Sequence, residues 1–343
     1  MSGRPDEGLF PDVDWRRVAF GGVLAVVVGA GVVFLIGRAA GLSVLKETLR
    51  EGSLGWLAVC AAGQLAVFLG YAGVFRGAAA FEDGVRISGR LSLRVTLASF
   101  GLTQLVAAGG AAALAITYWG LRRLGFDRED AAVRLIGLNT LVYAVFGVIG
   151  WVAALVALIA GEAPLAMTLP WLAGIPVLVL AARWFTAPGR VERWTKPARS
   201  WSRRGLAVGV GAAWWTRRAL AARSGRGMEV SALAYWVGDL ASLWGGLRAF
   251  DADPGLAALA LVYATGYLAQ SVPLPFIATG GVDAATTFAL TAVGIPLESA
   301  LAGVIAHRVF AFWLPLVPGL LLAARLPETG RRLRAARLPA TAR

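Results

Sequence analysis

The sequence predicts an all-α, polytopic membrane protein whose two halves are inverted repeats of each other. Three observations predict it: the apolar composition, the length of the apolar stretches and a repeated sequence pattern. Of the 343 residues, 58% are hydrophobic and 15% are charged, and the mean hydropathy is +0.68. Soluble domains have about 25% charged residues, so most of this chain is expected to lie in a lipid bilayer.

Apolar stretches alternate with polar segments along the chain, and several reach the ~20 residues that are needed to cross a ~30 Å hydrocarbon core. Continuous spans are expected at 18–36, 54–75, 131–160, 167–185, 230–247 and 299–323, and interrupted apolar stretches occupy 94–123 and 256–292. Each repeat then has the order span, span, interrupted stretch, span. We expect a single integral membrane domain over 1–343, with a first repeat at 1–160, a second repeat at 161–325 that contains a basic insert at 187–228, and a basic cytoplasmic tail at 326–343.

The repeat is visible when "AAGGAAALAITYWGLRRLGFDREDAAVRLIGLN" is aligned with "ATGGVDAATTFALTAVGIPLESALAGVIAHR". Both segments begin with a glycine pair, Gly109-Gly110 or Gly280-Gly281, and continue with small residues. A further glycine follows at position 125 or 294, and a glutamate comes four residues after it. Self-similarity of this kind indicates a repeated architecture.

The distribution of charge predicts how the repeats are oriented. With the N-terminus in the cytoplasm, the basic segments 76–94, 187–228 and 326–343 all fall on the cytoplasmic side, as the positive-inside rule requires. This balance holds only when each interrupted stretch begins and ends at the same membrane face. We therefore expect two re-entrant helical hairpins, one from each face, in a multi-pass protein of the cell (inner) membrane with both termini cytoplasmic. Inverted repeats of this kind are common among secondary transporters.

The formal net charge is +13, from 33 lysines and arginines against 20 acidic residues. The basic residues lie between the expected spans, and no soluble basic domain is present that would bind nucleic acid. The insert at 187–228 combines arginines with Trp194, Trp201, Trp214 and Trp215. This pattern is typical of an amphipathic segment at the membrane interface, so we expect the insert to bind an anionic lipid surface on the cytoplasmic side.

The two glycine pairs have two interpretations. Small residues let transmembrane helices pack closely. Alternatively the helix breaks at each pair, as is indicated by Pro273 and Pro275 before the second pair and by Gln104 before the first. A broken helix presents free N–H groups and a partial positive charge, which bind anions. Two such breaks, entering from opposite faces, predict a site for an anionic group such as a lipid phosphate.

Charged residues inside the expected spans are candidates for that site. Asp283 and Thr287 are four residues apart and share a helix face, although Asp283 can alternatively complement the dipole of its own helix. A buried carboxylate requires a partner, and Arg308 is the best candidate. His307 points about 100° away from Arg308 on a helix, and its simpler interpretation is a hydrogen-bonded packing residue. Asp239 lies deep in another apolar stretch.

No pattern for catalysis or metal binding stands out. The chain has a single cysteine, Cys60, and a single histidine, so neither an internal disulfide nor a histidine-rich metal site is expected. The acidic trio Asp127, Glu129 and Asp130 is explained by helix capping and by the helix dipole. The patterns H-E-x-x-H and G-x-S-x-G are absent. We therefore expect no enzymatic activity, no catalytic residue, no metal and no cofactor.

Several motifs occur together in "PLPFIATGGVDAATTFALTAVGIPLESALAGVIAHRVFAFWLPLVPG": P-x-P, the glycine cluster, Asp283, G-I-P, Arg308 and F-W-L-P. With "WVGDLASL" around Asp239, they resemble the lysylphosphatidylglycerol synthase transmembrane region, a flippase-like family. The resemblance implies lipid translocation rather than lipid aminoacylation, because no aminoacyltransferase domain is expected after the last span. The chain departs from the family in having Asp283 where glutamate is commoner. The charges are also unequal between the two repeats, because Ala112 aligns with Asp283 and Asn139 aligns with Arg308.

We therefore expect a lipid translocase that moves a phosphate-bearing lipid, either a phospholipid or a polyprenyl-phosphate lipid, between leaflets. The alternatives are a membrane scaffold for a separate lipid or envelope enzyme, which moves nothing, and a secondary transporter of small solutes. An oligomer is compatible with the sequence. No nucleotide-binding motif is present, so transport is expected to be passive or ion-coupled. The residues expected to bind substrate are Gln104, Gly109, Gly110, Asn139, Asp239, Gly280, Gly281, Asp283, Thr287 and Arg308.

Overall fold

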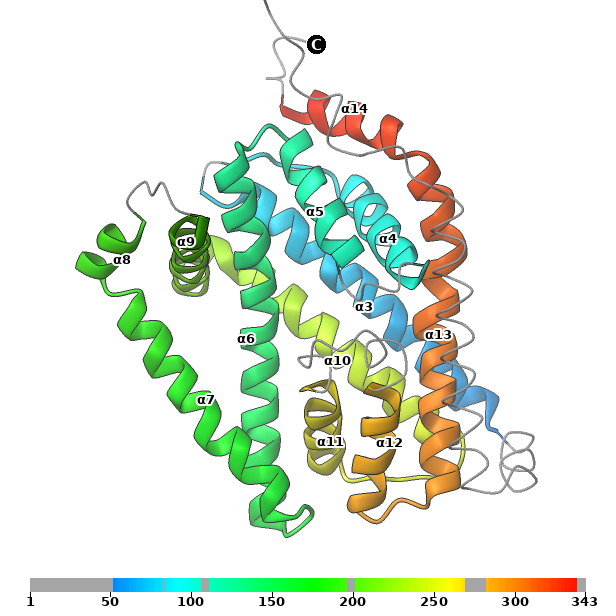
Figure 1. Ribbon diagram of the computed structural model, residues 1–343. Helices are drawn as coiled ribbons and strands as arrows, with labels where there is room; N and C mark the ends of the chain where they lie inside the picture. The colour runs from blue at the N-terminus through cyan, green and yellow to red at the C-terminus, as the bar shows by residue number, and fades with distance from the viewer. Residues whose placement is uncertain (1–51, 83, 106–110, 196–200, 269–281, 338–343) are drawn as a thin grey trace, which may run out of the picture.

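The computed structural model describes residues 52–82, 84–105, 111–195, 201–268 and 282–337. Within these residues all regular elements are helices, from α3 (Leu54–Ala80) to α14 (Leu326–Arg337) (Figure 1). The all-α fold class predicted from the sequence is therefore confirmed. The expected span 18–36 and both glycine pairs, Gly109-Gly110 and Gly280-Gly281, lie outside the described residues.

Four helices of the described part are long and apolar enough to cross a membrane: α3, α6 (Arg128–Ala160), α7 (Leu165–Phe185) and α13 (Leu297–Ala324). They contain the expected spans 54–75, 131–160, 167–185 and 299–323. The start of α6 is set by Asp127, whose carboxylate accepts hydrogen bonds from the backbone N–H groups of Glu129 and Asp130. The capping role predicted for this acidic trio is therefore confirmed.

A further span was expected at 230–247, and the structure has a helix there, α10 (Arg226–Arg248). Its 23 residues give a length of about 35 Å at 1.5 Å per residue. It is not among the four apolar candidates, because it contains acids and many small residues instead of a continuous apolar surface. Those small residues allow close packing on α3: a Cβ added to Gly70 of α3 would lie 2.6 Å from the backbone nitrogen of Tyr235. That α10 crosses the bilayer stays a prediction.

Two pairs of shorter helices occupy the interrupted stretches. The first pair is α4 (Gly89–Leu105) and α5 (Ala111–Arg123), and the second is α11 (Leu256–Leu268) and α12 (Val282–Ala292). The two members of each pair pack against each other, and Figure 1 shows the first pair in the upper half of the molecule and the second in the lower half. Residues 94–120 are therefore not one continuous helix. The membrane re-entrance of the two pairs stays a prediction.

The packing of the two halves is repeated. α3 and α10 pack along each other at the centre, α4 packs on α13, and α11 packs correspondingly on α6. The glycines that the sequence alignment matched also share a conformation, with φ of 90° at Gly125 and 93° at Gly294, a region that favours glycine. These likenesses are those expected of two similar halves, while their inverted orientation in the membrane stays a prediction.

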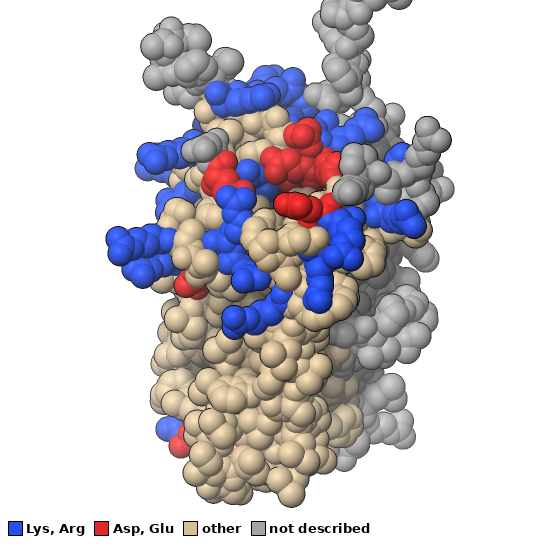
Figure 2. All heavy atoms as spheres, turned by 90° about the vertical axis from the view of Figure 1, so that its left-hand side faces the viewer, with Lys and Arg blue, Asp and Glu red and all other residues tan. Residues whose placement is uncertain are grey.

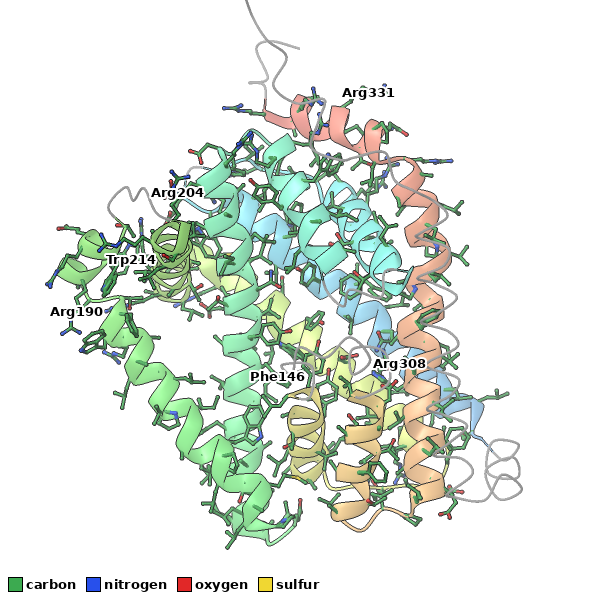
Figure 3. All side chains as sticks on the ribbon, viewed as in Figure 1. Phe146, Arg190, Arg204, Trp214, Arg308 and Arg331 are labelled. Carbon is green, nitrogen blue, oxygen red and sulfur yellow. The ribbon has the colours of Figure 1, made fainter. Side chains whose placement is uncertain are left out.

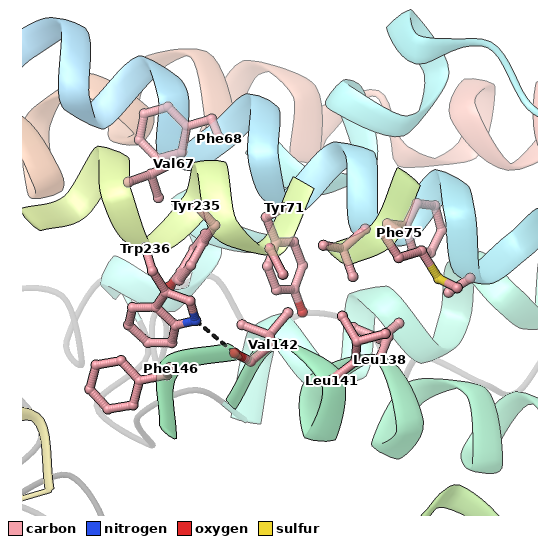
Figure 4. Packing of buried hydrophobic residues seen from close by; sticks show 14 of the residues in the cluster. Val67, Phe68, Tyr71, Phe75, Leu138, Leu141, Val142, Phe146, Tyr235 and Trp236 are labelled. Carbon is pink, nitrogen blue, oxygen red and sulfur yellow. Dashed lines mark hydrogen bonds between the residues drawn. The ribbon is translucent and has the colours of Figure 1, made fainter. Parts of the chain in front are cut away.

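The core at the crossing of α3, α6 and α10 is rich in aromatic side chains (Figure 4). Trp236 of α10 stacks on Phe146 of α6, with ring centroids 4.2 Å apart. The indole N–H of Trp236 donates to the carbonyl oxygen of Val142 at 2.7 Å. This bond satisfies the polar atom of a side chain that is 1% exposed, and so fixes the face of α10 that turns toward α6.

Charged side chains gather toward one end of the molecule, and most of the opposite end is uncharged on the face that Figure 2 shows. The charged end carries α8 (Pro188–Trp194), α9 (Trp201–Ala221), the 3-10 turn Arg223–Gly225 and α14 (Figure 1). α9 packs on α6. In Figure 1 α6 runs vertically in the plane of the picture and α9 is viewed nearly along its axis, so the two helices cross at a steep angle. The basic insert expected at 187–228 is therefore largely helical, and α9 runs across the neighbouring long helix.

The segment expected as a basic tail, 326–343, instead forms α14 over residues 326–337. The helix is amphipathic: Leu333 is fully buried, and the arginines lie mainly on the outer face. α14 packs on α4 and α5, which gives its apolar side a partner. This helix was not predictable from hydropathy, because its charged residues outweigh its few leucines.

Candidate functional site

The predicted partners Asp283 and Arg308 meet in the structure. The Nε of Arg308 on α13 donates to Oδ2 of Asp283 on α12 at 2.8 Å, and its Nη2 donates to Oδ1 of the same carboxylate. This is a bidentate pair, the geometry in which guanidinium and carboxylate bind most strongly. Figure 3 shows Arg308 on α13 well away from the charged end, where Arg204 and Arg331 lie.

Asp283 lies in the first turn of α12, which begins at Val282. A carboxylate at that position also interacts favourably with the partial positive charge of the helix N-terminus. The two interpretations offered by the sequence therefore hold together: Asp283 complements its own helix and pairs with Arg308. The Arg308 side chain keeps 37% of its surface exposed, against 19% for Asp283, so the pair is accessible from the arginine side.

A second polar cluster surrounds Asp239 on α10. One carboxylate oxygen, Oδ1, accepts a hydrogen bond from Nε2 of Gln64 on α3 at 2.7 Å. The other oxygen accepts from the hydroxyl of Tyr263 on α11. The Nε2 of His307 on α13 lies 3.8 Å from Oδ1. Four helices thus contribute to one carboxylate, which satisfies the requirement that a buried charge be hydrogen-bonded.

His307 faces this second cluster and not the Arg308–Asp283 pair. Its Nδ1 lies 3.0 Å from Oγ of Ser242 and 3.5 Å from Nε2 of Gln64. Ser242 in turn lies 3.2 Å from Sγ of Cys60. The prediction that His307 and Arg308 point in different directions is confirmed, and so is the hydrogen bonding expected of the histidine.

The two clusters are neighbours because His307 and Arg308 are consecutive on α13. Asp239 is near enough to Arg308 to act on it electrostatically. An aromatic wall adjoins them: the ring centroid of Tyr263 lies 5.6 Å from that of Tyr267 and 6.2 Å from that of Trp236. The site therefore combines one accessible cation, two carboxylates and a histidine beside an apolar aromatic surface.

Other residues expected at the site do not join it. The Thr287 hydroxyl donates to the backbone oxygen of Asp283 at 2.7 Å, so its hydrogen bond stays within its own helix. Asn139 likewise donates to the backbone oxygen of Leu135 at 2.8 Å, and within the described residues no hydrogen bond joins it to the Arg308–Asp283 pair. Gln104 lies in α4, but its side chain is outside the described part, as are the four glycines at 109, 110, 280 and 281.

Sequence reasoning missed Gln64, Tyr263 and Ser242. Gln64 could have been found, because it is an amide in the middle of an apolar span and is only 2% exposed, and intramembrane polar residues are functional candidates. Tyr263 and Ser242 have no such signal, since a tyrosine in "LALVYATGYL" or a serine in "DLASLW" is equally consistent with packing. In the described part of the chain, no three side chains of the usual metal-binding types form a group that could hold a metal ion.

Comparison with known proteins agrees with the resemblance seen in the sequence. The family described as Lysylphosphatidylglycerol synthase TM region matches residues 22–319, which includes α3 to α12 and most of α13, and thus every residue of both polar clusters. No curated protein matches the chain. Because the match extends over most of the sequence, the chain belongs to the family of the lysylphosphatidylglycerol synthase transmembrane region.

Proposed function

We propose that the protein is a lipid translocase that moves a phosphate-bearing lipid between the leaflets of the cell membrane. The observation that carries the proposal is the Arg308–Asp283 pair, in which an arginine within the helical bundle keeps 37% of its side chain exposed. A charge inside a membrane protein is costly and usually serves transport or binding. The family match supports a role in lipid-related function.

Arg308 is suited to exchange one anion for another. Guanidinium binds phosphate in the same forked geometry in which it binds carboxylate. A lipid phosphate that reaches Arg308 can therefore replace Asp283, which keeps part of its stabilisation from the N-terminus of α12. The aromatic residues Tyr263 and Tyr267 would line the path of the adjoining lipid portion. The substrate class is a phospholipid or a polyprenyl-phosphate lipid.

The basic helices α8 and α9 would bind anionic lipid at the cytoplasmic interface. Each basic residue near an anionic surface contributes about 1 kcal/mol, and the aromatic side chains of this region favour the interface. Arg190 lies over the ring of Trp184 at 3.8 Å from its centroid, a contact that keeps a cation beside an interfacial aromatic. Both termini are then cytoplasmic, in accord with the charge distribution of the sequence.

The test is leaflet-resolved labelling in proteoliposomes. Fluorescent phosphatidylglycerol, fluorescent polyprenyl phosphate and, as a neutral-headgroup comparison, fluorescent phosphatidylcholine are bleached from outside, and the fraction that becomes accessible is followed in time. We expect the wild type to move at least one of the two anionic lipids, and Arg308→Lys to lose that activity. Val309→Leu is a matched control, because Val309 is the next residue on α13 and is 44% exposed.

Absence of movement for both anionic lipids would contradict the proposal and favour a scaffold. Equal movement of all three lipids, unaffected by Arg308→Lys, would show scrambling without the proposed site. Uptake of a water-soluble organic anion in place of lipid would favour a small-solute transporter.

A further inference from the structure

The environment of His307 leaves one place for an additional proton. Asp239 as a carboxylate only accepts hydrogen bonds, so the Gln64 atom that faces it at 2.7 Å is the amide nitrogen. That same nitrogen lies 3.5 Å from Nδ1 of His307. A donor aimed at Nδ1 favours the neutral tautomer with hydrogen on Nε2, the nitrogen that faces Asp239 at 3.8 Å. Nδ1 is then the free basic atom of the ring.

Ser242 can accept a proton placed on Nδ1. Its hydroxyl oxygen lies 3.0 Å from Nδ1, and a hydroxyl can reverse its role from donor to acceptor by rotating. The freed hydroxyl hydrogen can then point toward Sγ of Cys60, 3.2 Å from Ser242 Oγ. Protonation of His307 therefore requires the Ser242 hydroxyl to rotate and the Gln64 amide to turn its second hydrogen away from Nδ1.

Burial of the His307 ring opposes a charge on it, and the charged groups around the ring decide how far an added anion can offset that cost. The charged groups that act on it are Asp239 of α10, Asp283 of α12 and Arg308 of its own helix. Together with the imidazole, these three groups sum to one negative charge when His307 is neutral and to zero when it is protonated. The other titratable side chains of the cluster are Cys60 of α3 and Tyr263 of α11, both neutral in their ordinary state. On the neighbouring α4, Arg94 instead lies 3.9 Å from Glu328 of α14.

From this arrangement we infer that His307 binds a proton that crosses the membrane together with the lipid phosphate, one proton for each monoanionic headgroup. The inference rests on the proposed function and adds its energy source. Binding a phosphate at Arg308 adds a negative charge to the cluster, so it favours protonation of His307; by reciprocity, the protonated histidine favours the phosphate. The proton comes from water, forms an Nδ1–H bond and returns to water on the other side, with no oxidant or reductant.

The sharpest test uses the fact that the chain contains a single histidine. Full-length protein labelled with ¹⁵N-histidine, purified without a histidine tag, gives one imidazole whose nitrogen shifts report its tautomer and its charge. In nanodiscs of phosphatidylcholine we expect the neutral form with hydrogen on Nε2. Addition of phosphatidylglycerol, or of polyprenyl phosphate in a parallel sample, should convert the signal to imidazolium at the same pH, and Arg308→Lys should prevent the conversion. A signal that neither lipid changes would overturn the inference.

The second test measures coupling in proteoliposomes. Lipid and proton together carry no net charge, so a pH gradient should drive lipid into one leaflet whereas a membrane potential alone should not. One pH unit should change the leaflet ratio about tenfold, since one proton then contributes a factor of ten. His307→Gln, which keeps a hydrogen-bonding side chain but cannot titrate, should abolish the dependence of the leaflet ratio on the pH gradient, and a tenfold response that persists in this variant would overturn the proton site.

The outcomes separate the two proposals. Translocation that ignores the pH gradient in the wild type would overturn the proton site alone. Translocation driven by membrane potential alone would overturn the one-to-one stoichiometry on which the proton site rests. No translocation under any condition would contradict the proposed function, and this inference with it.

Discussion

The two halves of the molecule provide corresponding helices with different chemistry. In the second half α12 and α13 carry Asp283 and Arg308, which pair through two hydrogen bonds. At the aligned positions of the first half, α5 and α6 carry Ala112 and Asn139. The Asn139 side chain donates a hydrogen bond to the backbone of its own helix. The first half shows that these helices pack without an ion pair at the aligned positions, so packing alone does not require the pair in the second half.

A second arginine makes the comparison sharper. Arg134 on α6 is 5% exposed, and its Nη1 donates to the backbone oxygens of Ala78 and Phe81 at 2.8 and 2.9 Å. These carbonyls belong to the C-terminal end of α3, where unpaired carbonyls need donors. The Nε of Arg134 also donates to both oxygens of Asp130 on its own helix at 3.2 Å. Arg134 therefore fixes the end of α3 against α6, while Arg308 binds only a carboxylate of another helix among the contacts described, which another anion can replace.

The largest effect is expected for Asp283→Ala. It removes the partner of Arg308 and leaves an uncompensated cation inside the bundle. Loss of one partner costs ~3–5 kcal/mol when the pair is fully buried, and the lower end is expected here because Arg308 is 37% exposed. Unfolding in detergent should show this loss, and translocation should be abolished. Ala112→Ser, at the aligned position of the first half, is the control. Equal losses in both variants would break the comparison.

Replacing each arginine by lysine should separate the two roles. Arg308→Lys keeps the charge near Asp283 but loses the fork, so we expect a translocation rate lower by about 10–100-fold, the equivalent of one charge-assisted hydrogen bond, with little loss of stability. Arg134→Lys should do the reverse, lowering the melting temperature while the folded fraction translocates normally. The comparison fails if the two variants show the same pattern.

Exchanging the partners tests whether Asp283 and Arg308 interact or are merely close. In the double variant Asp283→Arg/Arg308→Asp, stability should recover relative to the alanine variants, while translocation should stay lost because the cation has moved to α12. A double-mutant cycle on the free energy of unfolding should give a coupling of about 1–3 kcal/mol. A coupling of zero would leave Asp283 with its helix dipole as its sole partner.

Asn139→Leu should have a smaller effect. Asn139 stands where the second half has Arg308, and the Tyr71 hydroxyl interacts with its side chain. Loss of that neutral contact should cost about 1 kcal/mol and leave translocation unchanged. A translocation defect as large as that of Arg308→Lys would show that both halves contribute to the site.

The smallest effect concerns an exposed ion pair, which shows how much the interior location matters. Hydrogen bonding by Arg332 in α14 holds the pKa of Glu328 below its ordinary value of 4.5. A lowered pKa means that the carboxylate stabilises the folded state above its ordinary pKa, and that this contribution is lost as the pH falls through the lowered one. Hydrogen exchange of residues 326–337, corrected for intrinsic rates, should rise slightly over that range. Glu328→Gln should remove the pH dependence; if it persists, another group is responsible.

Much of the fold could be read from composition and pattern. The spans at 54–75, 131–160, 167–185 and 299–323 were predictable because an apolar run of that length has few alternatives to a helix in lipid. That 94–120 contains two helices, α4 and α5, which pack against each other, was expected from the glycine pair in this stretch. α14 could not be read in this way, because its stability comes from the contact of Leu333 and its neighbours with α4 and α5.

For the site, the sequence alone indicated Arg308 as the best candidate partner of Asp283, because two opposite charges in apolar segments each require a partner. It also determined that His307 and Arg308 diverge, because consecutive helical residues point about 100° apart. Only the tertiary structure decided what His307 meets. Gln64, Asp239 and Tyr263 come from three helices, of which α3 is far from α10 and α11 in the sequence, and no spacing rule brings them together. Their meeting depends on the close packing of α3 with α10, which small residues permit and which side-chain identity at distant positions does not encode locally.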